Sequence, residues 1–252
     1  MSRPFDQKEL FRFSEHVLNE CMNAAATLKF DKADAQQLCV ICLHGSVIEL
    51  ASGVLELSKL QQGAGIPILF RAMLEAFAKL RCCLNNPGHP KVMAAKFQAE
   101  KLRLLRTAQA EPENEFLSGI RRELDIDTEV RTIQDGLARL TAEGHGPVST
   151  VAEFERAGLK AVYGSMYWNL CLHSHSNLSA LQDRHLNVNG DSYEVAWFKE
   201  PEHDDVLRNL DSMCGAVITA AIDVHKLLDA ETVPAMRRLQ DELSQLRAIY
   251  TQ

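Results

Sequence analysis

Two charged side chains stand four residues apart in the otherwise apolar stretch of residues 69–77. If this stretch is helical, Arg71 and Glu75 share one helix face and lie side by side. A carboxylate that holds a guanidinium in place fixes the direction of its donors, and such an arrangement suits the binding of a phosphate group. The alternative is a structural or solvent-facing ion pair, a role that such pairs often have without any further function.

A second polar cluster occupies residues 173–177, and further polar residues follow at 183–185. On a helix, His173 and His175 point about 200° apart, so they cannot both bind one metal ion. Histidine ordinarily titrates near neutrality, which makes His175 a candidate general acid/base. The side chains expected to assist it are those of Ser176, Asn177, Arg184 and His185. The alternative is a polar network that ties this helix to its neighbours.

The elements that must position these residues are almost all helical. Apolar residues recur at helical spacing in several segments bounded by capping or breaking residues. The helices predicted in this way span roughly 5–30, 33–62, 66–85, 90–110, 159–183, 202–229 and 232–250. Alternation around Asn189-Gly190 predicts one short β-hairpin. With no alternation of strands and helices, the sequence predicts an all-α, multi-helix bundle with an up-and-down core.

Residues 111–159 differ from the rest of the chain. They are polar and are interrupted by glycine and proline, with short helical patterns between the interruptions. We therefore expect a single helical domain over residues 1–252, in which residues 111–159 form an insertion or a lid.

Composition excludes several classes of protein. The 252-residue chain has a formal net charge of −7, which argues against a broad DNA-binding surface. Its seven scattered cysteines fit reduced thiols in the cytoplasm. The most apolar run, residues 38–57, is interrupted by His44 and Glu49, which favours a core helix over a membrane span. No phosphate-binding glycine loop occurs, and we expect no cofactor and no metal.

The two polar clusters resemble a family of helical bacterial proteins of unknown function. The resemblance is carried by an Arg-x-x-x-Glu helix at residues 70–76 and by a later Tyr-x-x-Leu-Cys…His-x-x-Leu segment at residues 167–178. It implies that Arg71, Glu75 and His175 line one site, with Tyr167 among the residues that bind substrate.

That family is in turn similar to the HEPN superfamily, helical bundles that often act as RNases in toxin–antitoxin and phage-defence systems. HEPN nucleases usually carry an arginine followed by a histidine after four to six residues. The one match to that spacing, Arg139…His145, has Leu140 where a polar residue is usual and lies among glycines. The resemblance therefore implies a composite site made by Arg71 and His175.

Three hypotheses follow. The first is a metal-independent RNase in which Arg71 holds the phosphate and His175 is the general acid/base. The second is a non-catalytic helical module that binds a nucleotide, a small anion or a protein partner. The third is a purely structural network on an oligomerising protein. We favour the first, with RNA or a nucleotide as ligand, and expect a homodimer because bundles with broad apolar helices often bury a face across a two-fold axis.

Overall fold

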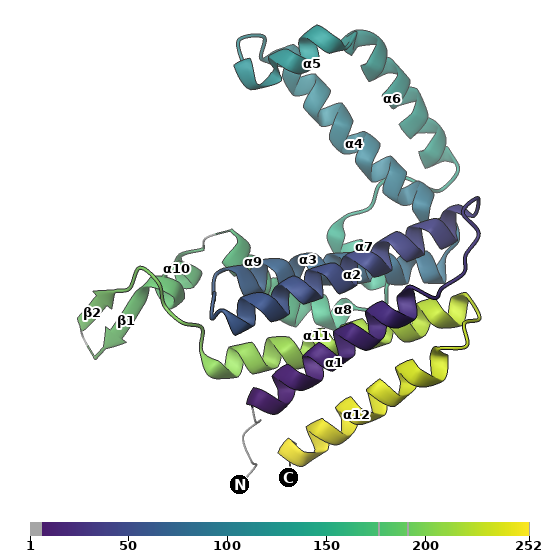
Figure 1. Ribbon diagram of the computed structural model, residues 1–252. Helices are drawn as coiled ribbons and strands as arrows, with labels where there is room; N and C mark the ends of the chain where they lie inside the picture. The colour runs from purple at the N-terminus through teal and green to yellow at the C-terminus, as the bar shows by residue number, and fades with distance from the viewer. Residues whose placement is uncertain (1–6, 176, 191, 252) are drawn as a thin grey trace.

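The computed structural model describes residues 7–175, 177–190 and 192–251. It shows the expected all-α bundle with one short hairpin (Figure 1). The main body is built from long helices whose limits lie within a few residues of those predicted. These are α1 (Gln7–Ala25), α2 (Ala35–Lys59), α3 (Gly65–Asn85), α11 (His203–Leu227) and α12 (Val233–Thr251).

Helix α2 begins where an aspartate caps it. The Asp34 carboxylate accepts hydrogen bonds from the backbone N–H groups of Gln36 and Gln37, at 2.8 and 3.0 Å, and so satisfies donors that have no partner within the helix. By length and composition alone α2 could cross a membrane, a test that core helices of soluble proteins also pass. Here it packs against α1, α3 and α11 (Figure 1).

One hydrophobic core joins the body. Helices α1, α2, α3, α11 and α12 all contribute fully or nearly fully buried apolar side chains. Phe70 of α3 and Leu210 of α11 are among the largest side chains that are completely covered. Burial of this kind fixes the axis of α3 in the body, and α3 carries the first candidate pair, Arg71 and Glu75.

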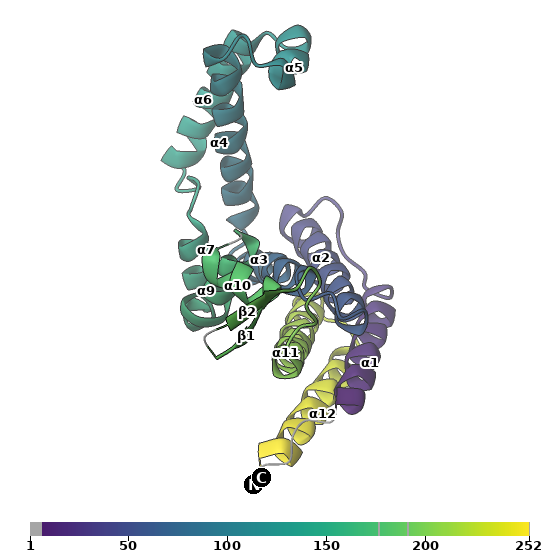
Figure 2. The same ribbon diagram turned by 90° about the vertical axis from the view of Figure 1, so that its left-hand side faces the viewer.

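A long arm projects from this body (Figures 1 and 2). It consists of α4 (His89–Ala110), a short 3₁₀ turn (Glu115–Leu117), α5 (Ser118–Glu123) and α6 (Ile126–Ala142). Leu102, Leu105 and Ile133 form a small core of its own between α4 and α6.

The arm does not have the limits of the predicted insertion. It includes α4, and it ends before α7 (Thr150–Arg156), whose Phe154 is buried in the main core. In both views the arm extends away from the bundle and does not lie over it as a lid would.

The single helix predicted over residues 159–183 is wrong, because the chain is interrupted there. The structure has α8 (Lys160–Val162), a π-helical turn η2 (Tyr163–Tyr167), α9 (Trp168–Ser174) and α10 (Leu178–His185). The break before α10 has a local cause: the Asn177 side chain accepts a hydrogen bond from the Ser179 N–H at 3.0 Å and starts a new helix.

The hairpin predicted around Asn189-Gly190 is confirmed. Strands β1 (Leu186–Asn189) and β2 (Ser192–Val195) pair antiparallel, with Asn189 opposite Ser192. Gly190 has a φ of +60°, a conformation that glycine adopts without steric cost.

Two histidines are buried where α2 meets α11. The rings of His44 and His225 have centroids 6.0 Å apart, and neither ring nitrogen of His44 has a hydrogen-bond partner among the described residues. Burial, and secondarily the neighbouring His225, lowers the pKa of His44 to about 4. Burial also lowers the pKa of His225. Both side chains are therefore neutral in the folded protein at neutral pH.

The free energy of unfolding is expected to fall as the pH is lowered from about 6.5 to about 4. In this window the unfolded chain protonates His44 at its ordinary pKa of 6.5 while the folded protein does not, so acid favours unfolding. The full shift of His44 corresponds to about 3 kcal/mol. Denaturant unfolding at a series of pH values measures the free energy of unfolding. This free energy should depend less steeply on pH in a His44→Leu variant than in the unmodified protein; an equal dependence in the two would contradict the prediction.

Candidate functional site

Four side chains from distant parts of the chain meet on one surface of the body. Arg71 Nε donates to Glu75 Oε1 at 3.1 Å along α3, and Arg71 Nη1 lies 3.3 Å from Nε2 of His175, which caps the C-terminus of α9. Tyr167, at the end of the π-helical turn, donates its hydroxyl to Glu75 Oε1 at 2.7 Å. The pairing of Arg71 with Glu75 is the one predicted from their spacing, and the proximity of His175 is the one that the family resemblance implied.

Tyr167 is the centre of this arrangement. Its side chain is only 4% exposed, its hydroxyl accepts from Arg71 Nε at 3.4 Å, and the Arg71 Cζ lies 5.5 Å from the ring centroid. The ring stacks on Tyr163 at 5.1 Å and packs against Phe154 at 4.7 Å. These contacts hold Tyr167 rigidly, and Tyr167 in turn holds Arg71 and Glu75.

The local backbone brings Tyr167 to this place. Residues 163–167 form a π-helical turn, an element that inserts an extra residue into a helix and is frequent at functional sites. Burial, followed by the hydrogen bond to the Glu75 carboxylate, raises the pKa of Tyr167 above its ordinary value of 10. Its hydroxyl therefore stays protonated and serves as a donor to Glu75.

His175 is exposed at the rim of the site. Its backbone N–H donates to the Cys171 carbonyl at 3.2 Å and closes the last turn of α9. Because a guanidinium has donors only, His175 Nε2 must be the acceptor of the contact with Arg71, and the ring hydrogen is then on Nδ1. A substrate anion that draws Arg71 away would free a basic nitrogen beside the anion.

The other predicted residues make hydrogen bonds that shape the surrounding backbone. Arg184 donates to the His173 carbonyl, His185 Nδ1 lies 3.2 Å from the Ala196 carbonyl oxygen, and Asn177 caps α10. Ser176 lies outside the described residues. The structure therefore brings Arg71, Glu75, Tyr167 and His175 together and places the remaining described candidates at backbone contacts.

His173 differs from His175 in its surroundings. Its pKa is lowered, first by burial and then by the nearby positive charge of Arg184. Its ring is therefore held neutral at neutral pH, as part of the packing between α9 and α10. Across the described ranges, no three histidine, cysteine or acidic side chains gather closely enough to hold a metal ion.

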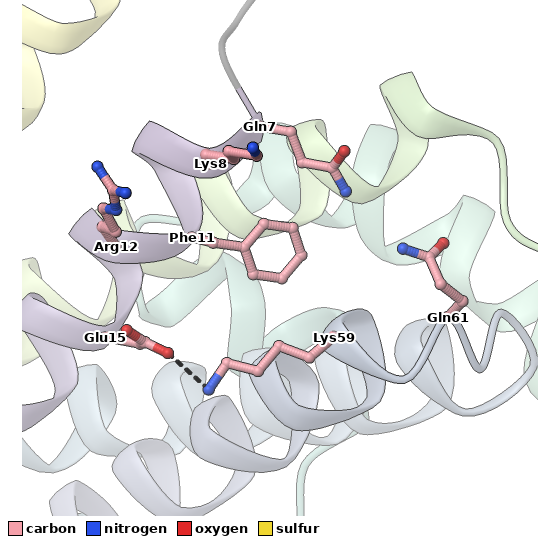
Figure 3. A pocket seen from close by; sticks show the side chains of 7 residues that line it. All are labelled: Gln7, Lys8, Phe11, Arg12, Glu15, Lys59 and Gln61. Atoms are coloured by element: carbon pink, nitrogen blue, oxygen red, sulfur yellow. Dashed lines mark ion pairs between the residues drawn. The ribbon is translucent and has the colours of Figure 1, made fainter.

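The body also has an open pocket of about 460 Å³ between the start of α1 and the end of α2 (Figure 3). The ring of Phe11 lies at its centre. Three cationic side chains line it, those of Lys8, Arg12 and Lys59, and Lys59 is paired with the carboxylates of Glu15 at 2.8 Å and Glu56 at 2.7 Å. None of the four residues of the candidate site lines the pocket.

Tyr167→Phe is expected to lower the free energy of unfolding by about 1–2 kcal/mol, because Glu75 loses a charge-assisted hydrogen bond in a partly buried setting. Urea denaturation measures the change. Tyr163→Phe is the matched control, since Tyr163 contributes its ring to the same stack and is expected to change stability less. Equal losses in the two variants would show that the Tyr167 hydroxyl has no special role.

Comparison with known proteins places this surface in a family. Residues 37–193 match DUF5677, a family of unknown function. The chain matches no curated protein and no solved structure. The matched segment runs from α2 into β2, so it contains Arg71, Glu75, Tyr167 and His175. The chain belongs to the DUF5677 family of unknown function.

Proposed function

We propose that this protein is a metal-independent RNase of a toxin or phage-defence type, distantly similar to the HEPN proteins. The observation that carries the proposal is the 3.3 Å contact between Arg71 Nη1 and His175 Nε2. The contact supports the proposal because a fixed cation and a side chain that can transfer a proton are the two groups that cleavage of a phosphodiester by its own 2′-hydroxyl requires.

In the proposed reaction the scissile phosphate takes the place of His175 on Arg71. The 2′-hydroxyl attacks phosphorus as His175 Nε2 takes its proton, and the bond to the 5′ oxygen breaks. The products are a 2′,3′-cyclic phosphate and a 5′ hydroxyl, whose oxygen receives its proton from solvent. Arg71 stabilises the negative charge that develops on the phosphorane, where a preoriented cation contributes most.

Glu75 and Tyr167 have positioning roles in this scheme. Glu75 binds the Nε side of Arg71, and Tyr167 binds Glu75 while its ring lies against the guanidinium. The Nη side of the guanidinium is thereby turned toward His175 and available to a phosphate. Positioning of this kind lowers the entropy lost when the substrate binds.

The test is incubation of the purified protein with total cellular RNA, with and without EDTA. We expect cleavage in both conditions and fragments that end in 2′,3′-cyclic phosphates. Cleavage that requires a divalent ion would contradict the proposal. With no cleavage under either condition, the second hypothesis, a module that binds a nucleotide, an anion or a protein partner, becomes the better account of the same four side chains.

A further inference from the structure

Trp168 is a large aromatic side chain beside the candidate site that the proposed chemistry does not use. It directly follows the buried Tyr167, yet it is 60% exposed. It begins α9, and His175, the C-cap residue that follows this helix, comes seven residues later. Seven residues are close to two helical turns, so the two side chains share one face about 10 Å apart along the axis.

The direction of this face follows from the buried residues of α9. Tyr167 and Leu170 are covered and point into the body, whereas His175 is exposed and reaches Arg71. Since Trp168 has nearly the same helical phase as His175, the indole and the His175 ring lie along the same edge of α9. A ligand held at Arg71 and His175 would therefore extend along this edge toward Trp168.

We propose that Trp168 is a stacking platform for an unpaired nucleobase of single-stranded RNA whose neighbouring phosphate is held by Arg71. The identity of the ligand as RNA rests on the proposed function; the stacking contact is the new element. An unpaired base next to the bound phosphate is stabilised when it stacks on an aromatic ring. An exposed indole offers such a ring, and any of the four bases can stack on it. Bases inside a duplex are already stacked, so this contact selects single strands.

Local charge favours Trp168 over Trp197 and Phe198 as the stacking side chain. Trp197 and Phe198, after the hairpin, are even more exposed, but they lie between Glu194 and Glu200 along the chain, and the one cation in that stretch, Lys199, lies 3.9 Å from the Glu202 carboxylate. Negative charge there opposes an RNA backbone. Trp168 instead shares a face of α9 with His175, whose ring contacts the Arg71 guanidinium.

The experiment uses tryptophan fluorescence, since Trp168 and Trp197 are the two tryptophans of the chain. A Trp197→Phe variant leaves Trp168 as the reporter. The probe is a short single-stranded 2′-O-methyl oligonucleotide, which lacks the attacking hydroxyl and cannot be cleaved. We expect saturable quenching by the single strand and little by the same sequence as a duplex.

A second measurement determines how much the Trp168 side chain contributes to the affinity for the oligonucleotide. In the full chain, Trp168→Ala should weaken binding of the same oligonucleotide about 5- to 100-fold, as expected for the loss of one stacked base. Phe116→Ala is the control, because this aromatic is even more open to solvent but lies in the short 3₁₀ turn between α4 and α5 of the arm; we expect no change in affinity.

The outcomes separate this inference from the catalytic proposal. Quenching without any cleavage of natural RNA supports the stacking contact and rejects the RNase. Absence of quenching, or an unchanged affinity in Trp168→Ala, overturns the stacking contact even if RNA is cleaved. Trp168 emission could also change with protein concentration and not with the oligonucleotide. That result would assign Trp168 to a contact between two copies of the chain and would likewise overturn the stacking contact.

Discussion

His175→Ala is expected to lower kcat for RNA cleavage by about 10²- to 10⁴-fold, the range typical of a lost general acid/base. The protein should remain folded, because the His175 side chain is exposed and the contact described for it is the one to Arg71. Its backbone hydrogen bond to Cys171 does not depend on the imidazole. Single-turnover cleavage of a short RNA, with circular dichroism to check folding, measures the effect.

His175→Gln is the sharper variant. A glutamine amide oxygen can accept the hydrogen bond from Arg71 but cannot take a proton from a 2′-hydroxyl. We therefore expect His175→Gln to be as inactive as His175→Ala while binding an uncleavable 2′-O-methyl oligonucleotide as tightly as the unmodified protein. Activity retained by His175→Gln would show that His175 contributes binding alone.

Lys96→Met is expected to lower the free energy of unfolding by about 3–5 kcal/mol, the typical cost of leaving one member of a buried ion pair alone. Lys96 Nζ lies 2.9 Å from Glu153 Oε2, with side chains 26% and 3% exposed. Glu153 Oε1 is already without a hydrogen-bond partner among the described residues. The pair joins α4, at the base of the arm, to α7 in the body.

Two further variants make this result specific. Lys91→Met removes the same charge from the same helix, but its pair with Glu143 is solvent-exposed, so a loss of less than about 1 kcal/mol is expected. Adding Glu153→Met to Lys96→Met should recover much of the lost stability, because no buried charge then remains. If urea denaturation showed the same small loss in the free energy of unfolding for Lys96→Met and Lys91→Met, the pair of Lys96 with Glu153 would not be what stabilises the attachment of the arm to the body.

Local rules were sufficient to predict part of the site. The spacing of Arg71 and Glu75 makes them neighbours on any helix, and the apolar residues around them favour one. The hairpin followed from the signal at Asn189-Gly190, because a two-residue loop, here between Asn189 and Ser192, sets how the two strands pair. In these places the structure depends on residues close together in the sequence.

Contacts between distant residues could not be predicted in this way. The resemblance named Tyr167 as a site residue, but its role as the group that holds Arg71 and Glu75 depends on a π-helical turn and a stack with Tyr163 and Phe154. Helical periodicity assumes 3.6 residues per turn and passes over such an insertion. The break at Asn177 was missed for a similar reason, since the polar residues there fit a helix interior and a cap equally well.

The arm shows the same limit. Periodicity gave α4 as one more bundle helix, because its apolar residues have the same spacing whether they face the main core or a single partner. Only the pairing of α4 with α6, through Leu102, Leu105 and Ile133, shows that this helix leaves the body.

The central claim is that Arg71 and His175 cleave RNA without a metal ion. The most direct measurement compares the unmodified protein with folded Arg71→Ala and His175→Ala variants in EDTA, on an oligonucleotide with one ribonucleotide among 2′-O-methyl residues. The account predicts a single cut after that ribonucleotide, a 2′,3′-cyclic phosphate end, and loss of the cut in both variants. Cleavage that persists in either folded variant, or no cut by the unmodified protein, would contradict it.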